Sequence, residues 1–315
     1  MHKGNGFMKK EYLILVALII LLGAYLLFHK ENKNNYTLPE IAKIDTAKIT
    51  GLIINKGKNP ISLTKNEKTW VVSDKKYPAD SSSLENIFDT LKTLKLSALV
   101  SENEDLRRYD LDEENSIQVK VITGQTKAFE FTMGKTAPSF NHTFIRLTDD
   151  KNIYHATGNF RAYFDKTIED FRDKKVMEFK KDSIKQVFIE KEGLSKTLVS
   201  VKGETSDSVS WRSEDGAAAD KETVSNLLSA VSFLKCEKYL NDTSKKKFEN
   251  EKPLVKLDLK NNINLSLFKT DAQDNLIGIS SMNEYVFELS QFNAKEIESN
   301  IEKLLGIVKK EEIKD

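Results

Sequence analysis

The residues best suited to chemistry in this sequence are one thiol and a few imidazoles. Cys236 is the sole cysteine, so no internal disulfide can form. It stands where Leu96 stands in a phrase that the chain repeats, which predicts a small buried residue rather than a reactive nucleophile. His2, His29, His142 and His155 lie far apart and lack the spacing of metal ligands. We therefore predict no metal, no cofactor and no catalytic residue.

Two short motifs match catalytic signatures only in part. "MGK" (133–135) ends like a phosphate-binding loop, but it lacks the upstream glycine and the Ser or Thr after the lysine, and it closes a predicted strand. "DSSS" (80–83) sets hydroxyls beside a carboxylate, yet no histidine is placed by the sequence to activate one. A helix start explains this second pattern better.

Four side chains are candidates for binding a ligand. Arg146 stands in a predicted strand and could grip an anion, although a solvated or paired arginine is commoner there. Trp70 and Trp211 could form a sugar platform, but each precedes a predicted helix by nearly the same interval, which favours core anchors. With His155, they are the first candidates if a cleft holds a glycan, a lipid or a peptide.

The composition excludes some classes of partner. Lys and Arg number 49 against 48 Asp and Glu, so no strong net field attracts nucleic acid or acidic polymers. Apolar residues make up 39% and charged residues 31%, which indicates a globular chain with a wet surface. The length of 315 residues predicts about two domains.

The N-terminal segment predicts a membrane anchor. The apolar run 12–28 extends roughly 25 Å as a helix, near the short end of what crosses a bilayer. A cleaved signal peptide is the alternative, but bulky residues soon after Gly23 make a poor cleavage site. We therefore expect a single-pass anchor over 11–28, after a cytoplasmic 1–10 and before a polar stalk over 29–43. The basic residues ahead of the run orient the remaining chain to the periplasmic side of the cytoplasmic membrane.

The chain repeats one helical phrase in its second half. Residues 79–100 and 219–240 share an Ala-Asp start, followed by apolar residues at the spacing of one helix face. Asp80 and Asp220 precede these helices, where a carboxylate accepts hydrogen bonds from free backbone N–H groups. The shared apolar face comprises Leu84, Ile87, Phe88, Leu91 and Leu94 in the first copy, and Val224, Leu227, Leu228, Val231 and Leu234 in the second.

Strand-like runs surround both helices. Alternating apolar residues with short turns predict a hairpin after each helix, from "SIQVKVIT" to "TKAFEFTMG" and from "PLVKLDLK" to "INLSLFK". Each copy then ends in a predicted helix. The apolar faces of these last helices are Phe160, Tyr163, Phe164, Ile168 and Phe171 in the first copy, and Phe292, Ile297, Ile301, Leu304 and Leu305 in the second.

These patterns predict an α+β fold: a tandem duplication of an antiparallel-sheet-plus-two-helices unit, preceded by one N-terminal transmembrane helix. Each unit is expected to hold three strands, a helix, four strands and a helix. The first repeat is predicted over 44–176, the second over 177–308, and a charged tail over 309–315. "RDKK" (172–175) could orient the chain near a membrane or partner, but a charged hinge between the repeats is the favoured interpretation.

The order and spacing of several short motifs resemble a known family. "YDL" (109–111), "MGK" (133–135), "FIRL" (144–147) and "FRDK" (171–174) follow a tryptophan-bearing strand and the "ADSSSLENIFDTL" helix. The arrangement resembles the bacterial domain-of-unknown-function family numbered 4340 over nearly all of the chain after residue 8. Asp110 stands where that family often has glycine, and because Asp accepts a left-handed backbone the turn is expected to survive.

The resemblance implies a membrane-anchored protein, often encoded beside ABC-type permeases related to the gliding-motility transporter, and supplies no catalytic residues. Our leading hypothesis is a single-pass, non-enzymatic accessory protein whose extracytoplasmic domain contacts a membrane partner, such as an ABC permease complex. The alternatives are a module that binds a ligand in the cleft between the repeats and a carboxylate-dependent hydrolase.

Overall fold

The described part of the chain in this computed structural model combines antiparallel sheets with a few helices, so the predicted α+β class is confirmed. The predicted tail over 309–315, most of the predicted cytoplasmic segment 1–10 and residues 29–35 of the predicted stalk lie outside it. The structure describes residues 10–28, 36–57, 59–103, 105–202, 209–241, 243–260, 262–269 and 275–307.

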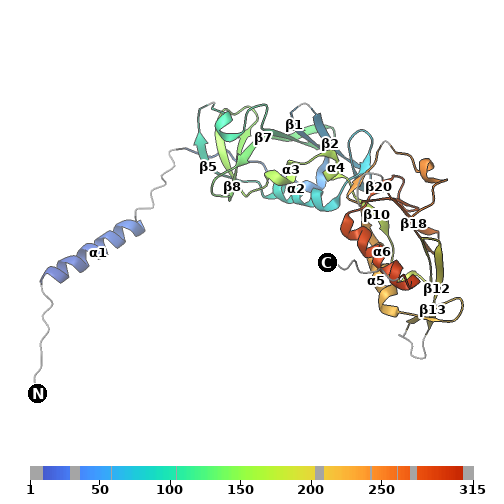
Figure 1. The fold of residues 1–315 in the computed structure, drawn as a ribbon. Coiled ribbons are helices and arrows are strands. Elements are labelled where there is room, and N and C mark those ends of the chain that lie inside the picture. The colour runs from blue at the N-terminus through green and yellow to red at the C-terminus, as the bar shows by residue number, and fades with distance from the viewer. Residues whose placement is uncertain are drawn as a thin grey trace, which may run out of the picture.

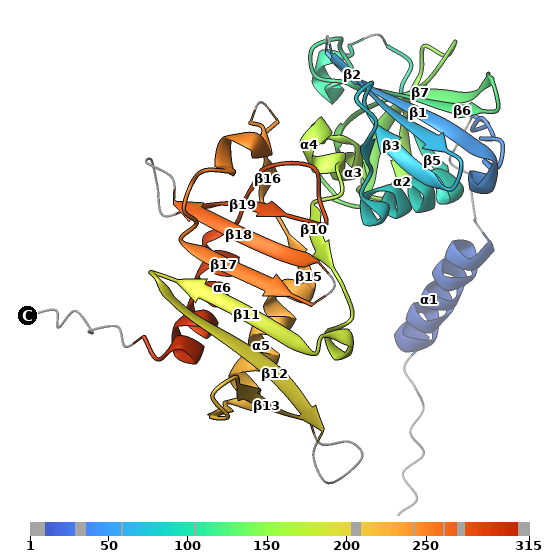
Figure 2. The ribbon, with the colours of Figure 1, turned by 90° about the vertical axis from the view of Figure 1, so that its right-hand side faces the viewer.

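Helix α1 (Lys10–Phe28) covers the predicted anchor. Its described apolar side chains are exposed, with Ile19 62% and Leu21 66% accessible, and Figures 1 and 2 show the helix clear of both large sheets. Across the described ranges, no helix reaches the combined length and hydropathy that a membrane crossing demands. Membrane insertion of residues 11–28 stays a prediction.

The first large sheet holds nine antiparallel strands within the described residues. Burial alternates along its central strand β6 because one face packs on helices and the other meets solvent or a loop. The strands run across the sheet in the order β4 (Tyr77–Pro78), β3 (Thr69–Val72), β2 (Asn59–Asn66), β1 (Ile49–Lys56), β6 (Ile117–Thr123), β7 (Thr126–Thr136), β8 (His142–Leu147), β9 (Ile153–Thr157) and β5 (Leu96–Ser101).

A second large sheet, again of nine strands over the described ranges, has the corresponding order. It comprises β14 (Ala218–Ala219), β13 (Val209–Ser213), β12 (Leu194–Lys202), β11 (Gln186–Lys191), β17 (Val255–Leu259), β18 (Ile263–Lys269), β19 (Leu276–Ser280), β20 (Phe287–Glu288) and β16 (Lys238–Tyr239). A small sheet pairs β10 (Lys175–Glu178) with β15 (Phe233–Lys235). The strand count per unit exceeds the prediction because β4, β14 and β16 are too short to show alternation. Strand β5 was also not expected, because it begins three residues after the end of α2, inside the phrase 79–100 whose apolar spacing predicted a helix.

Helices cover one face of each large sheet, as Figures 1 and 2 show. They are α2 (Ser81–Thr93), α3 (Arg161–Phe164) and α4 (Ile168–Phe171) in the first unit, and α5 (Lys221–Ser232) and α6 (Gln291–Leu305) in the second. The predicted helix starts are confirmed. Asp80 Oδ2 accepts the Ser83 N–H at 2.8 Å, and Asp220 Oδ2 accepts the Thr223 N–H at 3.1 Å.

The closing helices differ from the prediction. Instead of one helix over 160–171, the chain forms the two short helices α3 and α4, because Thr167 starts a new turn through a capping box with Asp170. In the second unit α6 is continuous, but Phe292, expected on the buried face, is 75% exposed. Ala294 occupies the buried stripe in its place.

Part of the predicted stalk is packed onto the first unit. Leu38 and Ile41 lie against its core, since burial removes their apolar surfaces from water. The Tyr36 hydroxyl accepts the backbone N–H of Leu99 on edge strand β5 at 2.9 Å. Residues 36–43 therefore belong to the first unit rather than to a polar stalk.

The segment 105–116, here called the roof loop, folds over the face of the first sheet opposite the helices. Its helical turn Arg107–Tyr109 ends at Asp110, whose φ of 55° is left-handed, as the "YDL" motif predicted. A Cβ on Gly134 would stand 2.0 Å from the Tyr109 carbonyl oxygen, so only glycine allows this approach. Lys135 Nζ lies 3.8 Å from Asp110 Oδ1. Gly134 and Lys135 of the "MGK" motif thus hold the roof loop against the sheet.

Gly134→Ala is expected to lower the free energy of unfolding by about 1–3 kcal/mol, because the new Cβ displaces the Tyr109 carbonyl. Gly51→Ala is the matched control, since a Cβ there meets its nearest neighbour at 3.5 Å, an ordinary contact. Guanidinium unfolding of both variants measures the difference. Equal stability of the two would contradict the role assigned to Gly134.

Candidate functional site

Arg172 joins the two units. Its side chain is 2% exposed, and its guanidinium carbon lies 3.6 Å from the ring centre of Tyr77 in the first unit. It also lies 4.0 Å from the ring centre of Tyr239 and 5.0 Å from that of Tyr285 in the second unit. A cation over aromatic faces is stabilised, more strongly where water is excluded. We call this group the Arg172 clamp.

Hydrogen bonds reinforce the clamp across the junction. Arg172 Nη1 donates to Glu169 Oε1 at 2.8 Å and to Asn241 Oδ1 at 2.7 Å. The Tyr239 hydroxyl donates to the Asp173 carbonyl at 2.8 Å. Because these partners come from both units, the guanidinium ties the units together by charge as well as by stacking.

The backbone of the linker is also paired on both sides. The Asp80 N–H donates to the Phe171 carbonyl and the Asp173 N–H to the Pro78 carbonyl, each at 2.8 Å, within the first unit. Strand β10 then pairs with β15 in the second unit. Residues 172–175, predicted as a charged hinge, are therefore a joint held by hydrogen bonds on both sides. The Arg172 clamp occupies the junction where the alternative hypothesis placed a ligand cleft.

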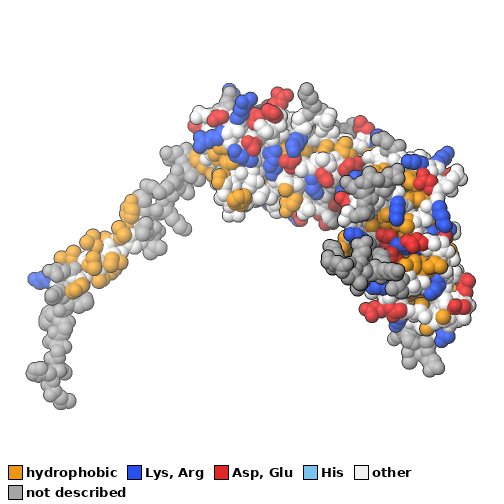
Figure 3. All heavy atoms as spheres, in the orientation of Figure 1, with side chains coloured by type: hydrophobic (Ala, Val, Ile, Leu, Met, Phe, Trp, Pro, Cys, Tyr) orange, Lys and Arg blue, Asp and Glu red, His pale blue; other side chains and the backbone are white. Residues whose placement is uncertain are grey.

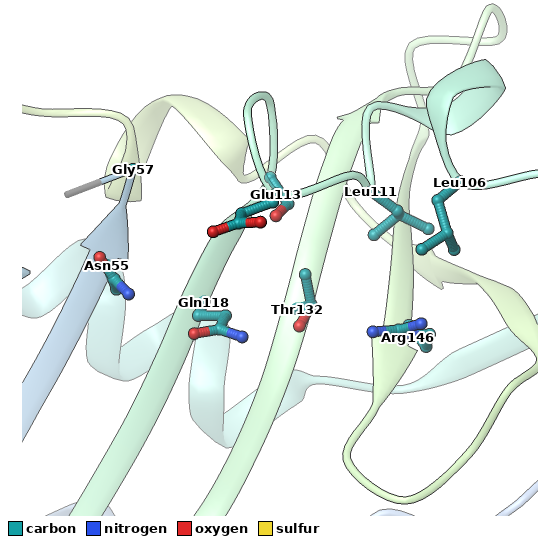
Figure 4. A pocket seen from close by; sticks show the side chains of 9 residues that line it. Asn55, Gly57, Leu106, Leu111, Glu113, Gln118, Thr132 and Arg146 are labelled. Atoms are coloured by element: carbon teal, nitrogen blue, oxygen red, sulfur yellow. The ribbon is translucent and has the colours of Figure 1, made fainter.

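Arg146 lines a cavity of about 350 Å³ on the face of the first sheet opposite the helices. Strand register sets Asn55 opposite Gln118, Gln118 opposite Thr132, and Thr132 opposite Arg146. Figure 4 shows these side chains in one row across β1, β6, β7 and β8. They face away from the helices because alternate strand residues such as Ile145 are buried in the core. A neighbouring hollow of about 370 Å³ shares three of them.

The roof loop closes this cavity from above. Leu106 and Leu111 lie over the arginine end of the row in Figure 4, and Glu113 reaches over the opposite end. Arg161 Nη2 donates to the Asn115 carbonyl at 2.7 Å and so ties the loop to the helical side of the unit. The cavity is therefore formed before any ligand arrives.

Two polar groups of the cavity lack partners among the described residues. Asn55 Oδ1 is buried and accepts no hydrogen bond there. The half-buried Arg146 guanidinium likewise makes no hydrogen bond or ion pair with the described part of the chain. Unsatisfied polar groups that are shielded from bulk water are costly, and a bound molecule or water relieves them. We call this cavity the Arg146 pocket and take it as the candidate functional site.

The second unit has a different row at the corresponding place. Strand register there aligns Glu190, Lys256, Ser266 and Ile279. Ile279 stands where Arg146 stands in the first unit and packs against an apolar cluster that includes Phe248. The polar pocket therefore belongs to one unit, although the strand order is shared.

The two tryptophans pack as the core anchors that their positions predicted. Trp211 is 7% exposed within the core of the second unit. Trp70 is half-buried, with its ring centre 5.3 Å from that of Phe88 on α2. Neither ring lines the Arg146 pocket, so neither offers a sugar platform there.

His155 lies on the same face of the sheet as Arg146 but outside the pocket. Its ring centre is 5.1 Å from that of His142 and 4.8 Å from that of Phe144, and its Nε2 has no partner among the described residues. Burial, and to a smaller extent His142, lower the pKa of His155. The imidazole is therefore neutral at neutral pH and supplies no charge to a ligand.

Other groups with chemical potential are buried or engaged. Cys236 is 5% exposed, and burial raises the pKa of its thiol to about 11, so the predicted small buried residue is confirmed. In the hollow beside the pocket, Glu130 pairs with Lys127 at 2.7 Å and Asp150 accepts the Tyr154 hydroxyl at 2.7 Å. Over the described ranges, no group of three or more His, Cys, Asp or Glu could hold a metal.

Arg172→Ala is expected to lower the free energy of unfolding by about 3–5 kcal/mol. The substitution leaves a cavity among three rings and removes the buried cation that pairs with Glu169. It should also speed chymotrypsin cleavage at Phe171 and Phe179, which flank the joint. Arg212→Ala, at an exposed strand arginine, is the matched control and should change stability by less than about 0.5 kcal/mol. Unchanged cleavage in the Arg172 variant would argue against a joint held by the clamp.

Comparison with known proteins identifies the family. No curated protein and no solved structure shows significant similarity to the chain. Residues 70–253, more than half of the chain, match the family described as a domain of unknown function, DUF4340. This stretch includes Arg146, the roof loop and all residues of the Arg172 clamp except Tyr285. The chain therefore belongs to the DUF4340 family.

Proposed function

We propose that the chain is a membrane-anchored accessory protein that contacts a membrane partner rather than transforming a substrate. The exposed apolar surface of α1 carries this proposal. Exposure is unbroken from Ile14 to Leu22, and Figure 3 shows the helix covered by apolar side chains. Apolar surface gains about 25 cal/mol per Å² on leaving water, and a helix apolar all round finds that environment in a bilayer.

The docked segment after α1 limits how far the first unit can lie from the membrane. The connection from Phe28 to Tyr36 can span at most about 28 Å, because each of its eight residue steps contributes at most about 3.5 Å. Tyr36 and Leu38 are already bound to the first unit. The proposed arrangement has the N-terminus in the cytoplasm and both units outside it, close to the membrane surface.

We further infer that the two units arose by duplication. The shared strand order supports this, and so does one ion pair in each unit. Lys56 and Lys191 are the last residues of β1 and β11. Lys56 pairs with Asp165 at the end of α3, and Lys191 pairs with Glu298 of α6 at 2.7 Å. Both lysines thus tie the first strand of a unit to its closing helical segment.

Duplication and the Arg172 clamp together favour an interaction role. Two units held at one angle present a long surface whose parts keep their spacing, which lowers the entropic cost of binding a large partner. An ABC-type permease complex is the class of partner that we propose, because the family resemblance implies such a partner and the proposed anchor would place both in one membrane.

Replacing Ile19 and Leu21 together by lysine should move the protein from the membrane to the soluble fraction of lysed cells. Each lysine at the centre of an inserted helix costs about 2.5–3.5 kcal/mol. Replacing the same two residues by alanine is the matched control and should leave the protein in the pellet after alkaline carbonate extraction. A soluble wild-type protein would refute the anchor.

Crosslinking in intact cells tests the interaction role. A photoreactive residue at the exposed position Gln125, and separately at Lys221, should capture a defined membrane protein from at least one unit. The same labels in the Ile19 and Leu21 lysine variant should capture far less, because the anchor concentrates the two partners in one plane. Recovery of the full-length protein as an uncrosslinked monomer with the label at each of the two positions would contradict the proposal.

A further inference from the structure

We propose that the Arg146 pocket binds a short peptide by its two free termini, a role beyond the membrane-anchored interaction proposed above. The C-terminal carboxylate meets the Arg146 guanidinium at one end of the polar row. The N-terminal ammonium meets Asn55 Oδ1 and the Glu113 carboxylate at the other end. The peptide groups between them lie over Gln118 and Thr132.

The arginine end suits a carboxylate. Arg146 has no partner among the described residues, and its planar fork matches the two oxygens of a carboxylate. Leu106 and Leu111 lie above it and keep water away from one side (Figure 4). Partial exclusion of water strengthens the attraction between unlike charges. The same leucines offer contact to an apolar side chain on the last residue of the peptide.

The opposite end suits an ammonium. Asn55 Oδ1 is a buried acceptor that lacks a donor among the described residues. Glu113 lies over this end of the row in Figure 4 and brings a negative charge to it. An ammonium carries three donors and a positive charge, so it can donate a hydrogen bond to Asn55 Oδ1 and form an ion pair with the Glu113 carboxylate at the same time.

The spacing of the row sets the length of the ligand. Neighbouring strands lie about 4.8 Å apart, so the backbones at Asn55 and Arg146, three strand spacings from each other, are separated by about 14 Å. The Arg146 guanidinium extends along the row toward Thr132 in Figure 4 and shortens this interval. An extended dipeptide or tripeptide, at about 3.4 Å per residue, then spans the remaining gap.

The middle of the row and the size of the cavity fit the same ligand. Gln118 both donates and accepts, and the Thr132 hydroxyl does so too, which matches the alternating N–H and C=O groups of a peptide. The cavity of about 350 Å³ lies in the range of small-ligand sites.

Other small ligands fit the lining less well. Arg146 is the one cation among the described lining residues, and Glu113 repels a phosphate dianion. Those residues include no aromatic ring on which a sugar face could stack. A molecule with separated opposite charges and amide groups between them satisfies every polar residue named above.

Calorimetry with the full-length chain in detergent tests this proposal with the tripeptide Ala-Ala-Leu. The free peptide should bind saturably, and amidation of its C-terminus or acetylation of its N-terminus should each weaken binding at least about tenfold, because each removes a charge-assisted contact. Equal affinity for free and blocked peptides, or no saturable binding at millimolar peptide, would overturn it. Binding in detergent does not depend on membrane attachment, so this result and the anchor test can fail separately.

Two variants assign the ends of the peptide. In Arg146→Gln, amidation should no longer weaken binding while acetylation still does, and in Glu113→Gln the reverse should hold. Arg212→Gln, which removes an exposed strand arginine from the second unit, should bind like the wild type. Thermal unfolding of each variant checks that it is folded, and if one variant unfolds, the other still tests its own end. A folded Arg146→Gln protein that keeps the full preference for a free C-terminus contradicts the assigned direction.

Discussion

The buried guanidinium of Arg172 is the constraint on which the arrangement of the two units depends. An arginine cannot shed its charge in a protein, so its burial must be compensated where it stands. Tyr77 comes from one unit, and Tyr239 and Tyr285 come from the other. Besides its ion pair with Glu169, the charge therefore meets all three rings only when the units are joined as they are here. Nη2 has no hydrogen-bond partner among the described residues, which makes the ring faces more important. The clamp therefore selects one relative placement of the units.

The same topology serves two different surfaces. In each unit, helices cover one face of the sheet, and a loop after the first helix reaches the other face. In the first unit this loop leaves a polar row open beneath it. In the second unit Ile279 and Phe248 close the corresponding space with apolar contacts. Shared architecture thus does not imply shared function, since side chains on an equivalent scaffold decide what can bind.

Features that depend on neighbours along the chain could be predicted from the sequence. The caps at Asp80 and Asp220 and the left-handed turn at Asp110 follow from hydrogen bonds and sterics within a few residues. The break at Thr167 was missed because apolar spacing favoured one helix while the capping box favoured two. The strands β4, β14 and β16 were missed because two residues carry no periodic pattern, and β5 was missed because its apolar residues continue the helical phrase 79–100. These misses change helix and strand boundaries and leave the class of fold intact.

The sequence by itself determined the apolar first helix, the α+β class, the helix caps and the packing of Trp211 in the core, because periodicity and local hydrogen bonding act over short distances. It also identified Arg146 as a candidate ligand-binding residue, but not the residues that lie beside it in the fold. Only the tertiary structure decided that Asn55, Gln118 and Thr132 share a row with that arginine, and that Arg172 closes the joint between the units. Both arrangements arise from strand register and from burial of a charge between distant segments, and such pairings depend on the whole fold rather than on adjacent residues.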